Sequence, residues 1–124
     1  MFSLVNVERT SRGLAALAPN DALARAARDY ARTLLEFPSL SHSADGTTVR
    51  DRTRAASYTG GPPLGEVLWL AVGVAPPERA VADWMASPPH RDAILNASFQ
   101  EAGAGCYFRQ AELPEARCVV DFGG

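Results

Sequence analysis

The order of the predicted elements indicates an α+β domain in which helices pack on both faces of a small sheet. Two segments with helical periodicity open the chain, an apolar segment lies near its middle, and two strand patterns close it. With 124 residues, the chain suits a single domain, residues 1–124, built around one core. Its apolar fraction of 47% is ordinary for a globular protein, so we expect an ordered fold.

The first third of the chain is predicted to be helical. A helix is expected over about residues 3–12, and Gly13 is a plausible residue for its C-terminal end. A second helix is expected to begin at Asn20, a good N-cap, and to end before Pro38. Apolar residues spaced by four, three and four positions give this helix one buried face, made of Leu23, Ala27, Tyr30 and Leu34.

The middle of the chain combines a short helix with an apolar segment. Thr47 is a candidate cap for a helix that reaches about Ala56. After a Gly- and Pro-rich loop, Glu66 introduces the apolar residues 67–72. Because both alternating faces of this segment are apolar, we interpret it as a central strand or as a buried segment covered on both sides.

The last third predicts two more helices and a hairpin. Proline is tolerated in the first turn of a helix, so Pro76 and Pro77 can start one, with a buried stripe of Ala80, Val81, Trp84 and Met85. Ser87 is a candidate N-cap for the next helix. Strand patterns over residues 102–109 and 116–122 flank a polar turn, which favours a hairpin.

Charge and hydropathy exclude two classes of partner. The formal net charge is −2 and the pI is about 5.6, which argues against nucleic acid as a partner. The longest apolar stretch, residues 67–75, is far short of the roughly 20 residues that a transmembrane helix needs. The N-terminal residues lack the features of a secretory leader, so the protein is either cytoplasmic or without its leader in this sequence.

The two histidines are the first candidates for a functional site. His42 lies between two serines in a predicted loop, and His90 follows Ser87 in the first turn of a predicted helix. The positive end of a helix disfavours an imidazolium there, and neutral imidazole is the form that binds a metal or accepts a proton. Solvation at the surface is the alternative interpretation for each histidine.

Glu66 is the third candidate, because it stands at the edge of the most apolar segment of the chain. Burying a carboxylate costs several kcal/mol unless it finds a partner. A histidine would make Glu66 part of a site, whereas Arg52 or Arg91 would make it part of a simple ion pair. The sequence leaves both open.

Cys106 and Cys118 fit a cross-strand disulfide in the final hairpin if they fall opposite each other. A disulfide would indicate an oxidising compartment, and the alternative is a pair of reduced, buried thiols. Neither cysteine belongs to a cluster with the spacing of a zinc knuckle.

Several of these motifs, in this order, resemble the CAP superfamily of cysteine-rich secretory, antigen-five and pathogenesis-related proteins, and its compact bacterial branch in particular. The resemblance rests on Leu4 to Gly13, Leu40-Ser41-His42, Gly65-Glu66, the stretch Trp84 to Leu95, and Val120-Asp121-Phe122-Gly123. It implies a three-layer α-β-α sandwich with a small, mainly antiparallel sheet flanked by helices. It also implies a cleft lined by two histidines and acidic residues, which in some members binds zinc or another divalent cation.

Carried over to this sequence, the resemblance assigns His42 and His90 as metal ligands and Glu66 as their hydrogen-bond partner or as the catalytic base for a bound water. Ser87 falls in the same cleft, near the place of the second acidic residue of many eukaryotic members, which has no clear counterpart here. Val67 replaces the asparagine that follows the glutamate in the family. These departures weaken any mechanism that needs two acidic residues.

Three functions are therefore weighed. We expect an exported or cell-surface monomer whose cleft binds a divalent cation and a small or peptidic ligand. The first alternative is a metal-assisted hydrolase of peptides or cell-wall material with Glu66 as general base, and turnover lost in Glu66→Gln would identify it. The second is a lipid or sterol carrier, which needs an apolar groove along Trp84 and Met85.

Overall fold

The structure, a computed structural model, describes all residues from 1 to 124. Five helices and four strands follow one another as α1 (Phe2–Thr10), β1 (Ala18–Pro19), α2 (Asp21–Leu34), α3 (Val49–Ala55), β2 (Leu64–Val72), α4 (Pro77–Met85), α5 (Pro88–Ile94), β3 (Glu101–Arg109) and β4 (Glu115–Gly123). None of the helices has the length and hydropathy that a membrane span requires.

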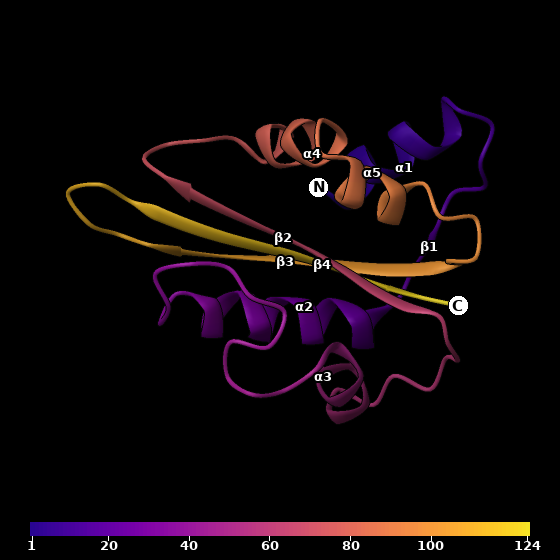
Figure 1. Cartoon of the computed structure of the whole chain (residues 1–124), viewed down its shortest axis with the longest axis horizontal. Helices are drawn as coiled ribbons and strands as arrows, with labels where there is room; N and C mark the ends of the chain where they lie inside the picture. The colour runs from indigo at the N-terminus through magenta and orange to yellow at the C-terminus, as the bar shows by residue number, and fades with distance from the viewer.

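The strands form one mainly antiparallel sheet in the order β1-β3-β4-β2. The two strands of the C-terminal hairpin pair with each other, and β4 pairs on its other side with β2. The short β1 joins β3 in parallel at the far edge. Figure 1 shows α1, α4 and α5 on one face of the sheet and α2 and α3 on the other. The three-layer α-β-α sandwich is thus confirmed.

The interior strands of the sheet are β3 and β4 and not β2, so the interpretation of residues 67–72 as a central strand was wrong. The reason is topological: the hairpin places β4 between β3 and β2, and β2 becomes an edge strand. Helices still cover both faces of β2, and its residues Val67, Leu68 and Trp69 are buried. The apolar residues on both faces of β2 therefore reflect its burial between two layers of helices. In this sheet an edge strand is buried in that way too.

Helix α2 folds as its sequence predicts. The side chain of Asn20 accepts a hydrogen bond from the backbone N–H of Leu23, which caps the helix. All four residues of the predicted face, Leu23, Ala27, Tyr30 and Leu34, are buried. The helix ends at Leu34, ahead of Pro38. Gly13, by contrast, lies in a short turn beyond the end of α1, where it adopts a φ of +79°.

The cysteines form the predicted disulfide. Cys106 on β3 and Cys118 on β4 are direct partners in the antiparallel register, with Cα atoms 4.1 Å apart. Cys118 is buried in the main apolar cluster, which also contains Trp84, Ile94 and Phe122. The disulfide therefore links the two strands of the hairpin from within the core.

Candidate functional site

Glu66 is a buried acid on the α2 side of β2. Alternation along the strand sends Val67 into the apolar cluster beneath α4, and so turns Glu66 and Leu68 toward α2 and α3. Only 2% of the Glu66 side chain is exposed. Nη2 of Arg52 bonds its two carboxylate oxygens at 2.8 and 2.9 Å. The buried Glu66 carboxylate is thus paired with a cation, and this cation is Arg52, one of the partners considered from the sequence.

The Arg52 guanidinium is held in place on several sides. Its Cζ lies 3.5 Å from the centre of the Tyr30 ring, close enough for a strong cation–π contact. Nη1 donates to the carbonyl oxygens of His42 and Thr47 at 3.0 and 2.9 Å. Helix α3, which carries Arg52, begins with a capping box between Thr48 and Asp51. The cation that fixes Glu66 is therefore itself fixed.

His42 contacts the same carboxylate from the solvent side. Its Nδ1 lies 2.9 Å from Oε1 of Glu66, and 60% of its side chain is exposed. An ionised carboxylate only accepts hydrogen bonds, so Nδ1 must carry the proton and donate. In the neutral ring the lone pair is then on Nε2. A buried acid thus orients an exposed imidazole.

The loop that carries His42 is tied to α2 through Tyr30. The Tyr30 hydroxyl donates to the carbonyl oxygen of Ser41 and accepts from the backbone N–H of Ala44. These bonds hold the backbone on both sides of His42. Burial raises the pKa of Tyr30, so the hydroxyl keeps its proton and remains a donor.

Asp121 adds a second acid that the sequence analysis did not select. It is fully buried on β4, directly opposite Glu66 on β2. Neither of its oxygens meets a donor from the protein. Burial, together with the adjacent Glu66 carboxylate, raises the pKa of Asp121 well above its ordinary value. Asp121 is therefore held in its protonated, neutral form beside the Glu66 carboxylate.

The pKa of Glu66 moves in the opposite direction. Burial by itself would raise it, but the hydrogen bond from His42, the neighbouring neutral Asp121 and the charge and hydrogen bonds of Arg52 outweigh burial and lower it. Glu66 is thus the ionised member of the carboxyl pair and Asp121 the neutral one. We call the connected residues Tyr30, His42, Arg52, Glu66 and Asp121 the Glu66 cluster.

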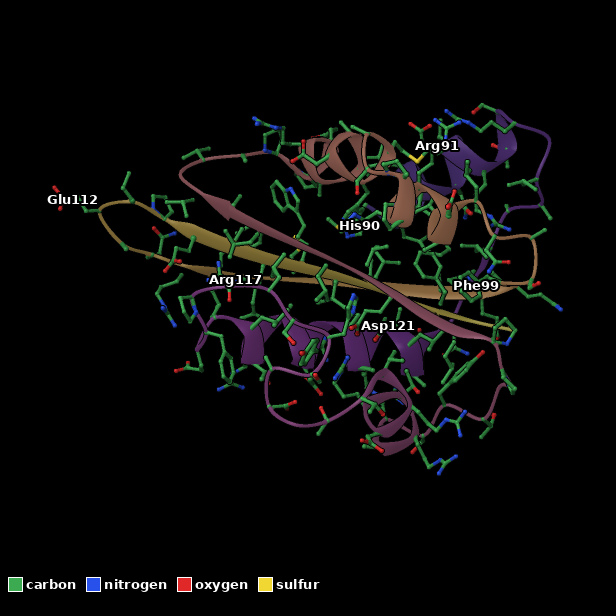
Figure 2. The ribbon with its side chains drawn as sticks, in the orientation of Figure 1. His90, Arg91, Phe99, Glu112, Arg117 and Asp121 are labelled. Carbon is green, nitrogen blue, oxygen red and sulfur yellow. A yellow bond between two sulfur atoms is a disulfide. The ribbon has the colours of Figure 1, made fainter.

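Ser87 and His90 form a separate pair on α5. Oγ of Ser87 lies 2.8 Å from Nδ1 of His90, and the Ser87 side chain makes no cap bond to the helix, although Ser87 is the N-cap residue as predicted. Figure 2 shows His90 between the sheet and the helices of its α5 side, and Asp121 on the α2 side. No hydrogen bond or ion pair links His90 to His42 or Glu66. The structure thus pairs His42 with Glu66 and Ser87 with His90, and no direct hydrogen bond or ion pair connects the two pairs.

The residues of the Glu66 cluster do not fit a metal ion in this arrangement. No three His, Cys, Asp or Glu side chains form a possible ligand set in the chain. The Glu66 carboxylate, which would attract a cation, is already bonded by a guanidinium. Binding of zinc or another divalent cation by His42 and His90 stays a prediction from the sequence.

A groove of about 400 Å³ opens beside the Glu66 cluster, between α2 and α3. Tyr30 and Arg52 belong both to the cluster and to the wall of the groove. The remaining wall is formed by alanines, by Thr33 and Thr47, and by three aspartates, Asp29, Asp45 and Asp51. We call this hollow the α2–α3 groove. Trp84, proposed to line an apolar groove in a lipid carrier, is instead buried in the core.

This fold and this cluster define a three-layer α-β-α domain, and comparison with known proteins identifies the family. The model of the cysteine-rich secretory protein family, CAP, matches residues 2–115. The chain therefore belongs to the CAP family. No curated protein matches it significantly.

Solved structures agree with the family assignment. An outer surface protein from Borrelia burgdorferi superposes with a TM-score of 0.79 at 27% identity, over 98% of this chain and 87% of that one. An extracellular protein with an SCP domain from Bacillus anthracis gives 0.77 at 24% identity, and a cysteine-rich secretory protein from Staphylococcus aureus gives 0.71 at 18%. Both comparisons cover 98% of this chain, but it spans only 38% and 36% of those two.

Two members of the cluster could have been found from the sequence. Asp121 interrupts an apolar strand pattern as Glu66 does, so the argument that a buried acid needs a partner applied to it as well. Tyr30 was predicted as a core residue, and its hydroxyl needed a hydrogen-bond partner there. Neither signal indicates by itself that the residue meets Glu66.

Proposed function

We propose that this CAP domain acts outside the cytoplasm as a binding module for a small or peptidic ligand, which His42 contacts through Nε2. Two observations support the location. The domain carries a disulfide, which persists in oxidising compartments. The similar structures from Borrelia burgdorferi and Bacillus anthracis are described as an outer surface protein and an extracellular protein.

The hydrogen bond between Glu66 and His42 carries the proposal. A surface histidine ordinarily samples several rotamers and both neutral tautomers, and ordering such a side chain on binding costs about 0.5–1.5 kcal/mol. Here Nδ1 is bonded to a buried carboxylate, so the ring has one tautomer and one orientation before any ligand arrives. Nε2 is left as a preorganised acceptor at the protein surface, which is a property of a recognition group.

The α2–α3 groove gives a ligand room next to the Glu66 cluster, because Tyr30 and Arg52 belong to both, although His42 is not part of the groove wall. It starts at Arg52 and Tyr30, and its volume of about 400 Å³ lies in the range of small-molecule sites, roughly 300–1,000 Å³. The groove combines an aromatic ring with threonine and aspartate side chains. A short peptide, which carries both apolar and hydrogen-bonding groups, suits such a wall.

The same contacts support a role for Glu66 as a positioning residue in preference to a general base. A general base must lie within hydrogen-bond reach of the proton that it abstracts and must have a suitable pKa. Glu66 is buried, its two oxygens are bonded to Arg52, and its pKa is lowered. These features favour binding over metal-assisted hydrolysis.

The test is an NMR titration of the ¹⁵N-labelled chain with soluble muropeptides and, separately, with zinc. We expect muropeptides to shift the His42 ring resonances and the amides of residues 41–47, and His42→Ala to abolish saturation. Arg91→Ala, at an exposed position of α5, is the matched control and should bind as the wild type does. Unchanged binding in His42→Ala would contradict the proposal. Hydrolysis of the muropeptides that is lost in Glu66→Gln would establish the enzyme alternative in its place.

A further inference from the structure

A second cavity lies on the opposite side of α3 from the α2–α3 groove. It measures about 370 Å³ and is formed between α3 and the segment that leads into β2, residues 58–64. We propose that this cavity binds a phosphate group, held by the guanidinium groups of Arg50 and Arg54 and by the Thr59–Gly60 segment. We call it the Arg50–Arg54 cavity.

The two arginines are placed to act together. They are four residues apart on α3, and side chains at this spacing are neighbours on one helix face. Both are exposed. Neither forms an ion pair or a side-chain hydrogen bond, whereas five other arginines of the chain, Arg12, Arg52, Arg79, Arg109 and Arg117, are each paired with a carboxylate. Their donors are therefore free for a ligand.

The rest of the wall adds donors and no negative charge. Thr59 contributes a hydroxyl, and the backbone N–H groups of Thr59 and Gly60 have no acceptor within the protein. No acidic residue lines the cavity. The nearby carboxylate of Glu101 is already used, because it accepts from the Tyr58 hydroxyl at 2.7 Å and from the Asn20 side chain at 3.3 Å.

The number and geometry of these donors favour phosphate. A guanidinium binds two oxygens of an oxyanion side by side, so two guanidinium groups offer more donors than the two oxygens of one carboxylate accept well. A phosphate monoester has three terminal oxygens and a larger charge. The two sides of α3 thus have opposite character, with three aspartates facing the α2–α3 groove and two unpaired arginines facing this cavity.

The experiment is a titration of the ¹⁵N-labelled chain with inorganic phosphate at constant ionic strength, with chloride as the replaced anion. We expect saturable shifts confined to residues 50–61. The double variant Arg50→Gln, Arg54→Gln should bind about tenfold more weakly or worse, since each charge-assisted bond is among the stronger hydrogen bonds of a protein. Arg50→Lys with Arg54→Lys keeps the charge but loses the planar fork, and should fall in between.

The matched control is Arg91→Gln, which removes the same charge from an exposed arginine on α5. Its phosphate affinity should stay within about twofold of the wild type, because only long-range, screened charge is lost. An equal loss in Arg91→Gln, or shifts that do not saturate, would overturn the proposal. Thermal melts of each variant confirm that the fold is retained.

Vesicles distinguish the two sources of phosphate. Co-sedimentation with phosphatidylcholine vesicles that requires both phosphatidic acid and the two arginines would identify a lipid headgroup as the ligand. Saturable binding of inorganic phosphate without vesicle binding would identify a soluble phosphate. Either result supports the cavity as the site.

Discussion

The two faces of the sheet are built from different chemistry. Toward α1, α4 and α5 the sheet is covered by an apolar cluster that includes Val67, Trp84, Ile94 and Phe122. The one buried charge in this layer, Arg9, donates to the backbone carbonyls of Ile94 and Asn96. Toward α2 and α3, by contrast, the same strands bury a set of charged side chains among apolar ones, namely Arg52, Glu66, Arg117 and Asp121.

This difference follows from the alternation of side chains along β4. Cys118, Val120 and Phe122 face the apolar cluster, and Val119 faces α2. Residues two apart in a strand share a face, so Arg117 and Asp121 face α2 as well. A buried charge has to find partners of defined geometry, whereas apolar packing only has to fill space. The α5 face should therefore supply stability that is insensitive to pH, and the α2 face should supply a defined and titratable arrangement.

The largest effect should come from Trp84→Ala on the apolar face. Trp84 is 2% exposed, and its ring nitrogen donates to the carbonyl oxygen of Leu68 at 2.8 Å. Removing the ring should cost about 3–5 kcal/mol in the free energy of unfolding. Urea unfolding at pH 5 and at pH 8 should give the same loss. A loss that changes with pH would show that the apolar face is coupled to the charged one.

Glu66→Gln should come next, because it removes the anion from a buried ion pair. Only 8% of the Arg52 side chain is exposed, and leaving such a buried charge unpaired costs about 3–5 kcal/mol. We expect Glu66→Gln to lower the free energy of unfolding by about 2–4 kcal/mol, because Asp121 can ionise and partly replace Glu66. Glu8→Gln is the control, as it breaks a surface pair with Arg12 whose loss should cost no more than about 1 kcal/mol. Equal costs in urea unfolding would mean that burial of the Glu66 pair is unimportant.

A smaller effect, with a characteristic sign, is expected from Asp121→Asn. The folded-state pKa of Asp121 is raised, so the stability that its proton provides is complete below its ordinary pKa of 3.8 and is lost as the pH rises through the folded value. The opposite holds for Glu66, whose contribution is present above its ordinary pKa of 4.5 and is lost as the pH falls through the lowered value.

Asparagine has nearly the shape of protonated Asp121 and is neutral like it, but it does not titrate. At pH 5 the variant should lie within about 1 kcal/mol of the wild type, and its stability should fall less as the pH rises to 8. Urea unfolding across this range measures both slopes. Identical slopes would indicate that Asp121 does not hold a proton in the folded state.

The fold was predictable because its signals are local. A period of 3.6 residues and an Asn cap specify α2, and two alternating segments around a polar turn specify the hairpin and bring the cysteines opposite each other. The position of β2 at the edge of the sheet was not predictable in this way. Strand order depends on which neighbours pair across the chain, and burial between two layers gives the same apolar pattern at an edge as at the centre.

The candidate site was predictable only in part, because the set of residues that meet in it depends on the face of the sheet on which each residue lies. The need of a buried Glu66 for a partner correctly suggested a histidine or Arg52, and the structure supplies both. His90 was joined to His42 by family resemblance and not by spacing. Its helix packs on the opposite face of the sheet from α2, a fact that no local pattern contains.

The smallest changes in the free energy of unfolding are expected for the N-cap residues of two helices, one in each helical layer. Thr48 on the α2 side accepts from the backbone N–H of Asp51, so Thr48→Ala should cost about 1 kcal/mol. Ser87 on the α5 side makes no such bond, since its hydroxyl is engaged with His90. Ser87→Ala should therefore cost clearly less than Thr48→Ala in urea unfolding, and should alter the NMR tautomer signature of His90 but not that of His42. If Ser87→Ala costs as much as Thr48→Ala, the Ser87 side chain caps α5 in solution, and the pairing with His90 is not its main role.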